Sequence, residues 1–106
     1  MCLKFLKRKK YPLIPPPYGT ELITVYGTAW CGDTQRSRKV LEARNIPYRW
    51  VDIDTDKIAE RYVFGVNHGN RSVPTIVFQD GSVLVEPKKA QLINKLAQIS
   101  PAPSAL

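Results

Sequence analysis

A single cysteine between an apolar run and a helical pattern is the feature that most restricts how this chain can fold. The run at 21–26 is rich in β-branched and aromatic residues and predicts a buried strand. Residues 35–45 predict a helix. Cys31 therefore lies where a strand meets the first turn of a helix, where unpaired backbone N–H groups and the helix dipole stabilise a thiolate. Gly32 and the polar residues after it indicate an exposed turn, which favours a reactive thiol over a buried, inert one.

The positive charge of the chain is concentrated ahead of this strand. Residues 1–19 contain five of the 16 Lys and Arg residues and none of the nine acidic residues, so the formal charge of +7 mainly describes the N-terminal end. Four prolines between positions 12 and 17 predict a stiff, extended spacer. We therefore predict a flexible basic leader at 1–19, one folded domain at 20–98 and a disordered tail at 99–106.

The composition also restricts the compartment and the partners. Two cysteines cannot form a disulfide framework, which favours a reducing, cytoplasmic location. No apolar run approaches the ~20 residues needed to span a bilayer, and the leader lacks the apolar core of a signal peptide. Because the charge of residues 20–106 is nearly balanced, we expect no nucleic-acid role. The basic leader offers at most a weak contact with an anionic membrane.

The remaining folded part predicts alternating helices and strands. Pro47 ends the first helix, because the residue before a proline is disfavoured in the α region. Asp80-Gly81 predicts a hairpin turn between two apolar runs. We predict strands at 48–53, 74–78 and 83–85, and helices at 56–66 and from 86 onward.

Two groups of polar residues raise the question of a metal site. Asp52, Asp54 and Asp56 alternate, but the sequence lacks the glycine and the closing Glu that a calcium loop needs. We expect Asp54 or Thr55 to cap the helix that follows. His68 is the only histidine, and it has no Cys or His neighbours at ligand spacing. We therefore predict no metal site.

The predicted order β-α-β-α-β-β-α, the cysteine after the first strand and a Val-Pro before the third strand resemble the thioredoxin fold. Within this fold the chain resembles the glutaredoxin family, and most closely its mycoredoxin-like and monothiol glutaredoxin-like members. The segments that carry the resemblance are Trp30-Cys31-Gly32, Ile46-Pro47-Tyr48, Val51-Asp52-Ile53-Asp54, Gly69-Asn70-Arg71-Ser72-Val73-Pro74-Thr75 and Asp80-Gly81. The resemblance implies an α/β architecture, with a four-stranded mixed sheet flanked by three helices.

The resemblance also implies roles for individual residues. Cys31 would be the nucleophile, and Pro74 would have a cis peptide bond and face it. Val73 would offer its backbone to a bound thiol, and Trp30 would also contact the substrate. Arg61 would lie where the family meets a carboxylate of the tripeptide glutathione.

The motif departs from the family where a second cysteine is usual. Redox-active relatives carry Cys-x-x-Cys, and the iron–sulfur carriers carry Cys-Gly-Phe-Ser, whereas this chain has Cys31-Gly32-Asp33-Thr34. One thiol cannot resolve a mixed disulfide within its own motif. We expect Thr34 to assist catalysis by donating a hydrogen bond to the Cys31 sulfur, while the Asp33 carboxylate opposes the thiolate.

Together these features predict a monothiol thiol–disulfide oxidoreductase that acts on mixed disulfides between proteins and a low-molecular-weight thiol. Glutathione or mycothiol would be the co-substrate, with no tightly bound cofactor, and the protein would act as a monomer. Two alternatives stay open. In an iron–sulfur carrier, Cys31 from two chains and two glutathiones would ligate one cluster. In a non-catalytic thioredoxin-fold protein, the domain would only bind partners.

Overall fold

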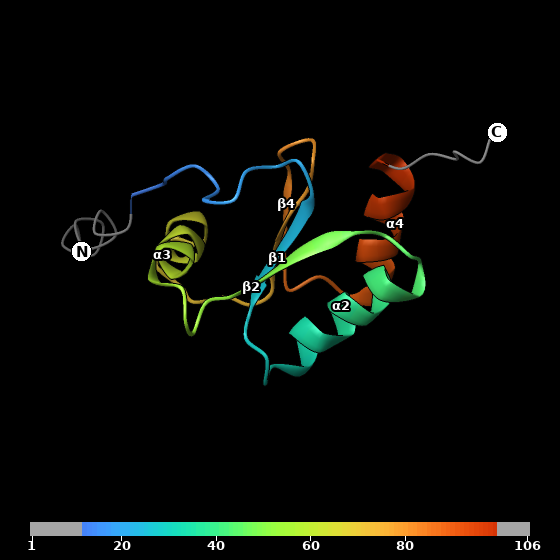
Figure 1. The fold of residues 1–106 in the computed structure, drawn as a ribbon, viewed down its shortest axis with the longest axis horizontal. Coiled ribbons are helices and arrows are strands. Elements are labelled where there is room, and N and C mark those ends of the chain that lie inside the picture. Colours follow the sequence, from blue (N-terminus) through green and yellow to red (C-terminus); the bar gives the residue numbers. More distant parts are fainter. Residues whose placement is uncertain (1–11, 100–106) are drawn as a thin grey trace, which may run out of the picture.

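The computed structural model describes residues 12–99, which form a sheet and the helices that pack on it. The elements follow in the order β1 (Ile23–Gly27), α2 (Gly32–Ala43), β2 (Tyr48–Asp52), α3 (Lys57–Val66), β3 (Thr75–Val77), β4 (Val83–Val85) and α4 (Lys89–Ile99). The strand order is β2-β1-β3-β4, with β1 parallel to β2 and the other pairs antiparallel. The predicted thioredoxin-like α/β architecture is confirmed (Figure 1).

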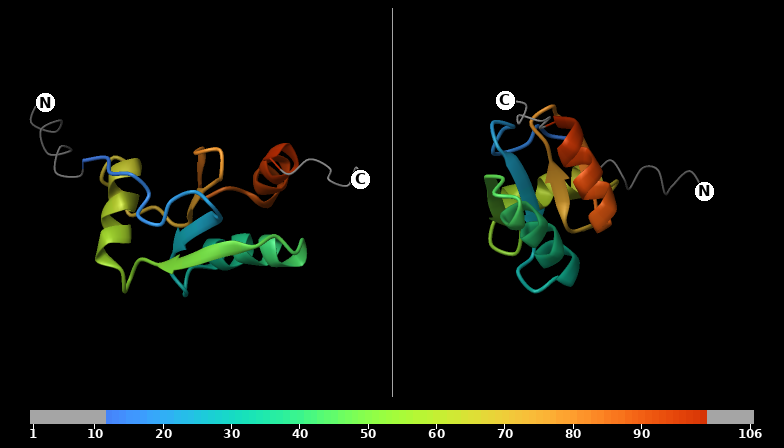
Figure 2. Two further views of the ribbon diagram at one scale, coloured as in Figure 1. Left: turned by 45° about the horizontal axis from the view of Figure 1, so that its top comes forward. Right: turned by 90° about the vertical axis from the view of Figure 1, so that its right-hand side faces the viewer.

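The helices cover both faces of the sheet. α3 lies on one side, while α2 and α4 contact each other on the opposite side, as the two views in Figure 2 show. Because successive side chains of a strand point to opposite faces, β1 contributes to both cores. Ile23 and Val25 pack with α2 and α4, whereas Tyr26 packs with α3. All of β1 is buried, which explains its nearly continuous apolar sequence.

Two helices begin at positions that differ from the prediction. α2 begins at Gly32 instead of 35, because Cys31 has an extended backbone and is the N-cap residue. α4 begins at Lys89 instead of 86, because Glu86 has a positive φ of 49°, which lies outside the right-handed helical region. The earlier start of α2 puts the cysteine directly at the helix terminus.

The cap of α3 also differs from the prediction. The Oδ1 atom of Asp56 accepts a hydrogen bond from the Ala59 N–H at 2.9 Å, which makes Asp56 the N-cap residue. The expectation that Asp54 or Thr55 would cap this helix was therefore wrong. The reason is geometric, since the helix starts later than the acidic run suggests, and this leaves Asp54 available for other contacts.

The chain ahead of β1 lies along α3. Ile14 packs against the core between the sheet and α3, and the Tyr18 hydroxyl donates a hydrogen bond to the Asp56 carboxylate. Gly65 lies so close to this segment that an added Cβ would be 2.7 Å from the Pro12 carbonyl oxygen. The described part of the predicted leader, residues 12–19, therefore contacts the folded domain through Pro12, Ile14 and Tyr18.

The end of β1 and the start of α2 are in close contact. A Cβ added to Gly27 would lie 2.6 Å from the Thr34 Oγ1 atom and 2.7 Å from its Cγ2 atom. Thr34 is fully buried, so a close-packed interior surrounds it and restricts its movement. Glycine at position 27 therefore sets how closely α2, together with its N-cap residue, approaches the sheet.

We expect Gly27→Ala to lower the free energy of unfolding by about 1–3 kcal/mol, because overpacking a filled interior forces side chains or backbone to shift. Chemical denaturation monitored by tryptophan fluorescence measures the loss. Gly32→Ala is the matched control, since apart from its chain neighbours and the adjoining helix backbone no atom of the described residues lies within 4 Å of its added Cβ. Thr34→Ala removes the two nearest atoms and should recover part of the loss in the double variant. A Gly27→Ala protein as stable as the wild type would contradict the contact.

Candidate active site

The backbone places Cys31 at the junction of β1 and α2. Its φ of −82° and ψ of 125° are extended, and its carbonyl oxygen accepts a helical hydrogen bond from the Gln35 N–H at 3.1 Å. Its own N–H donates to the Thr28 carbonyl oxygen at 3.3 Å, which closes the turn after β1. The side chain is half-buried. The thiol thus lies at the positive end of the helix dipole with part of its surface open to a reactant.

The loop before β3 brings a backbone carbonyl to this thiol. The Cys31 Sγ atom lies 3.9 Å from the Val73 carbonyl oxygen, to which it donates a long hydrogen bond. The Val73–Pro74 peptide bond is cis, as the resemblance implied. Pro74 is buried, and its carbonyl oxygen accepts a hydrogen bond from the Glu86 N–H at 2.8 Å. Two segments that are 42 positions apart in the sequence therefore meet at the sulfur.

Asp33 and Thr34, the last two residues of the motif, make different contacts from those that the sequence predicts. The buried Thr34 hydroxyl has no hydrogen-bond partner among residues 12–99, because the side chain packs under Gly27. The predicted hydrogen bond from Thr34 to the Cys31 sulfur is therefore not formed. Asp33 forms an ion pair with Arg36 at 2.8 Å, and both side chains are about half exposed. This pair offsets the negative charge that Asp33 would otherwise present beside the thiol.

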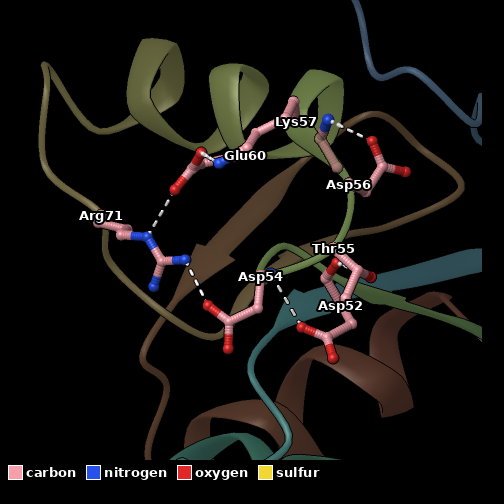
Figure 3. A network of polar contacts seen from close by, with 8 residues as sticks. Asp52, Asp54, Thr55, Asp56, Lys57, Glu60 and Arg71 are labelled. Atoms are coloured by element: carbon pink, nitrogen blue, oxygen red, sulfur yellow. Dashed lines mark hydrogen bonds and ion pairs between the residues drawn. The ribbon is translucent and has the colours of Figure 1, made fainter.

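A network of ion pairs connects the loop before β3 to the loop after β2. Figure 3 shows Arg71 between Glu60 on α3 and Asp54, with its Nε atom 2.8 Å from Glu60 and its Nη2 atom 2.6 Å from Asp54. The second Asp54 oxygen accepts a hydrogen bond from the Trp30 indole at 2.9 Å. Arg71 and the Trp30 indole hold the pKa of Asp54 below its usual range, and Glu60 and Asp54 raise the pKa of Arg71.

This network holds Trp30, one of the predicted substrate-binding residues, and does not include Arg61, another of them. Trp30 precedes Cys31, and its side chain is 70% exposed although its indole nitrogen is held by Asp54. An aromatic face is therefore presented to solvent beside the thiol. Arg61 is exposed on α3, and its side chain makes no ion pair or hydrogen bond with any residue of the range 12–99. It is thus available to an anion from solution.

Asp52, Asp54 and Asp56 each make a different structural contact. The Asp52 Oδ1 atom accepts a hydrogen bond from the Asp54 N–H at 2.9 Å, Asp54 pairs with Arg71, and Asp56 caps α3. Among the residues that the structure describes, no group of three or more His, Cys, Asp or Glu side chains could hold a metal ion. The acidic run therefore organises the loop between β2 and α3.

The network predicts that Arg71→Gln raises the pKa of Asp54 toward its ordinary value. The folded-state pKa of Asp54 is lowered, so its contribution to stability is present above the unfolded-state pKa and is lost as the pH falls through the folded-state pKa. The variant should therefore lose stability at neutral pH and little at acidic pH. Titration of the Asp54 side-chain carbon by NMR measures the shift directly.

Lys57→Gln is the control for this titration, because it removes an equal charge at an exposed contact 3.7 Å from Glu60. We expect it to change the pKa of Asp54 less than Arg71→Gln does. Equal shifts in the two variants would contradict a direct bond between Arg71 and Asp54 as the main cause.

Comparisons with known proteins agree with this geometry. The family model described as Glutaredoxin matches residues 23–84, which include the cysteine turn and the Val73–Pro74 bond. The Mycobacterium tuberculosis (strain H37Rv) protein named "Putative glutaredoxin Rv3198A" is 42% identical over 81 residues, covering 76% of this chain and 96% of that protein. Mycoredoxin 1 of Corynebacterium glutamicum is 35% identical over 78 residues, covering 74% and 96% respectively.

The solved structures agree on the fold. The crystal structure of the thioredoxin-like protein BC3987 has a TM-score of 0.57 and 27% sequence identity, and the match covers 73% of this chain and 97% of that one. The crystal structure of a mutant of the same protein has a TM-score of 0.60 at 25% identity, with 74% and 94% coverage. With the family model covering more than half of the sequence and relatives above 30% identity, the chain belongs to the glutaredoxin family of thiol oxidoreductases.

Proposed function

We propose that the protein is a monothiol oxidoreductase that removes a low-molecular-weight thiol from mixed disulfides with proteins. The observation that carries the proposal is the position of Cys31, half-buried at the start of α2 with its sulfur 3.9 Å from the Val73 carbonyl oxygen. The motif holds no second thiol, because Thr34 stands where a resolving cysteine would be. The chemistry therefore has to be completed by a second small thiol.

The reaction consists of two thiol–disulfide exchanges. The Cys31 thiolate attacks the sulfur of the small thiol, so that the protein–small-thiol S–S bond breaks and a Cys31–small-thiol S–S bond forms. The substrate protein leaves as a thiolate and takes a proton from solvent. A second small thiol, as its thiolate, then attacks the small-thiol sulfur bound to Cys31. This step releases the oxidised small-thiol dimer and regenerates Cys31 with no net change in the protein.

The surroundings of Cys31 support roles for three further residues. Val73 would pair its backbone with the small thiol, because its carbonyl already lies beside the sulfur. Trp30 would cover the bound molecule with its exposed aromatic face. Arg61 would attract a carboxylate of glutathione, whereas similarity to Mycoredoxin 1 favours mycothiol as the small thiol.

Comparing turnover with glutathione and with mycothiol in the Arg61→Gln variant separates these possibilities. The substitution should lower turnover only with a small thiol that carries a carboxylate.

We also propose a cytoplasmic monomer, with residues 20–98 as the catalytic domain. The low cysteine content supports a reducing compartment. None of the helices described between residues 12 and 99 is long and apolar enough to cross a membrane. Cys2 and the basic cluster lie outside the described residues, and a weak membrane contact of the leader stays a prediction.

We expect Cys31→Ser to lower reduction of a mixed-disulfide peptide by about 100-fold or more, because a serine hydroxyl is a weak nucleophile at neutral pH. Release of the peptide thiol, followed by mass spectrometry, gives the rate. Cys2→Ser is the control and should keep most of the wild-type rate. An equal loss in both variants would show that Cys2 takes part in the reaction and would refute a monothiol mechanism.

A further inference from the structure

A cationic groove runs between α2 and α4 on the face of the sheet opposite α3. It has a volume of about 680 Å³, and four basic side chains line it: Arg36, Lys39, Arg44 and Lys89. The half-buried Ile93 and the buried Val40 supply apolar surface at its base. Within the described part of the chain, neither a carboxylate nor an aromatic side chain lines it.

Most of the positive charge in this groove is not neutralised by carboxylates of the residues that the structure describes. Arg36 pairs with Asp33, but Lys39, Arg44 and Lys89 are exposed and form no ion pair with a carboxylate of residues 12–99. Like charges gathered along a concave surface create a positive potential that attracts an anionic ligand. This charge is also separate in sequence from the basic cluster of residues 4–10.

The groove begins beside the nucleophile. Gly32, which follows Cys31 directly, lines one end, and Arg44 lines it beyond the last turn of α2. Arg36, Lys39 and Ala43 lie three or four positions apart and so share one face of the helix. The 12 residues of α2 span about 18 Å. An extended polypeptide of about five residues covers the same length.

We propose that this groove binds the acidic segment that flanks the disulfide-bonded cysteine of a protein substrate. The proposal rests on the proposed function, because the occupant arrives with its sulfur at Cys31. The carboxylates of the segment would pair with the lysines and arginines of the groove. The methylene groups of its acidic side chains and its apolar residues would lie on Val40 and Ile93. A concave groove with an apolar base suits a polypeptide, and the lack of aromatic side chains among the described lining residues disfavours stacked bases.

The test compares two synthetic peptides whose central cysteine is disulfide-linked to the small thiol, one flanked by glutamates and one by lysines. We expect the wild type to reduce the acidic peptide with a kcat/KM about tenfold higher at low salt, and the preference to shrink as salt screens the charges. Lys39→Glu/Arg44→Glu should abolish or reverse the preference. Equal kcat/KM values for both peptides in the wild type would overturn the proposal.

Lys89→Gln and Lys88→Gln form a matched pair, because both lysines are exposed neighbours and only Lys89 lines the groove. Lys89→Gln should reduce the preference, and Lys88→Gln should leave it unchanged. All of these variants should reduce an uncharged small-molecule mixed disulfide at the wild-type rate, since Cys31 is intact. An equal effect of the two lysine substitutions would overturn the assignment to the groove.

The experiments distinguish a failure of the proposed redox function from a failure of the groove to bind an acidic segment. If the wild type reduces no small disulfide at all, the redox function is wrong. The groove is then tested by fluorescence anisotropy with an acidic peptide that carries serine in place of cysteine. Weaker binding to Lys39→Glu/Arg44→Glu than to the wild type supports the groove, and equal binding overturns it.

Discussion

The close approach of β1 and α2 is the constraint on which the site depends. Gly27 ends a strand that is buried on both faces, and the absence of a side chain there lets the buried Thr34 pack directly against the strand. This contact fixes the first turn of α2, and Cys31 caps that turn. The thiol is therefore positioned by core packing, and the polar residues around it can serve the substrate.

A second constraint on the site is the ion-pair network centred on Arg71. Arg71 joins the loop before β3 to Glu60 on α3 and to Asp54 after β2. Asp54 also holds the indole of Trp30. Partly exposed ion pairs contribute little to stability one by one, but several pairs that share one arginine fix the relative position of the segments they connect. The two loops that flank Cys31 are thus linked by charged side chains.

The fold and the thiol could be predicted from the sequence because their signals are local. The apolar run of β1, the Asp80-Gly81 turn and the cysteine between a strand and a helix all follow from neighbouring residues. Arg71 could not be assigned a role, because its partners lie 11 and 17 positions away. The expected hydrogen bond from Thr34 was wrong because burial under Gly27 depends on how two elements pack. The α2–α4 groove likewise requires the placement of α4, which no motif indicates.

The central claim is that Cys31 accepts the small thiol and leaves the substrate protein reduced. Its most direct test is to mix the reduced protein with one equivalent of a peptide–small-thiol disulfide, stop the reaction with acid, and identify the adduct by mass spectrometry. We predict that Cys31 carries the mass of the small thiol and that the free peptide thiol appears in equal amount. A Cys31–peptide adduct as the main product, or no adduct on Cys31, would contradict the account.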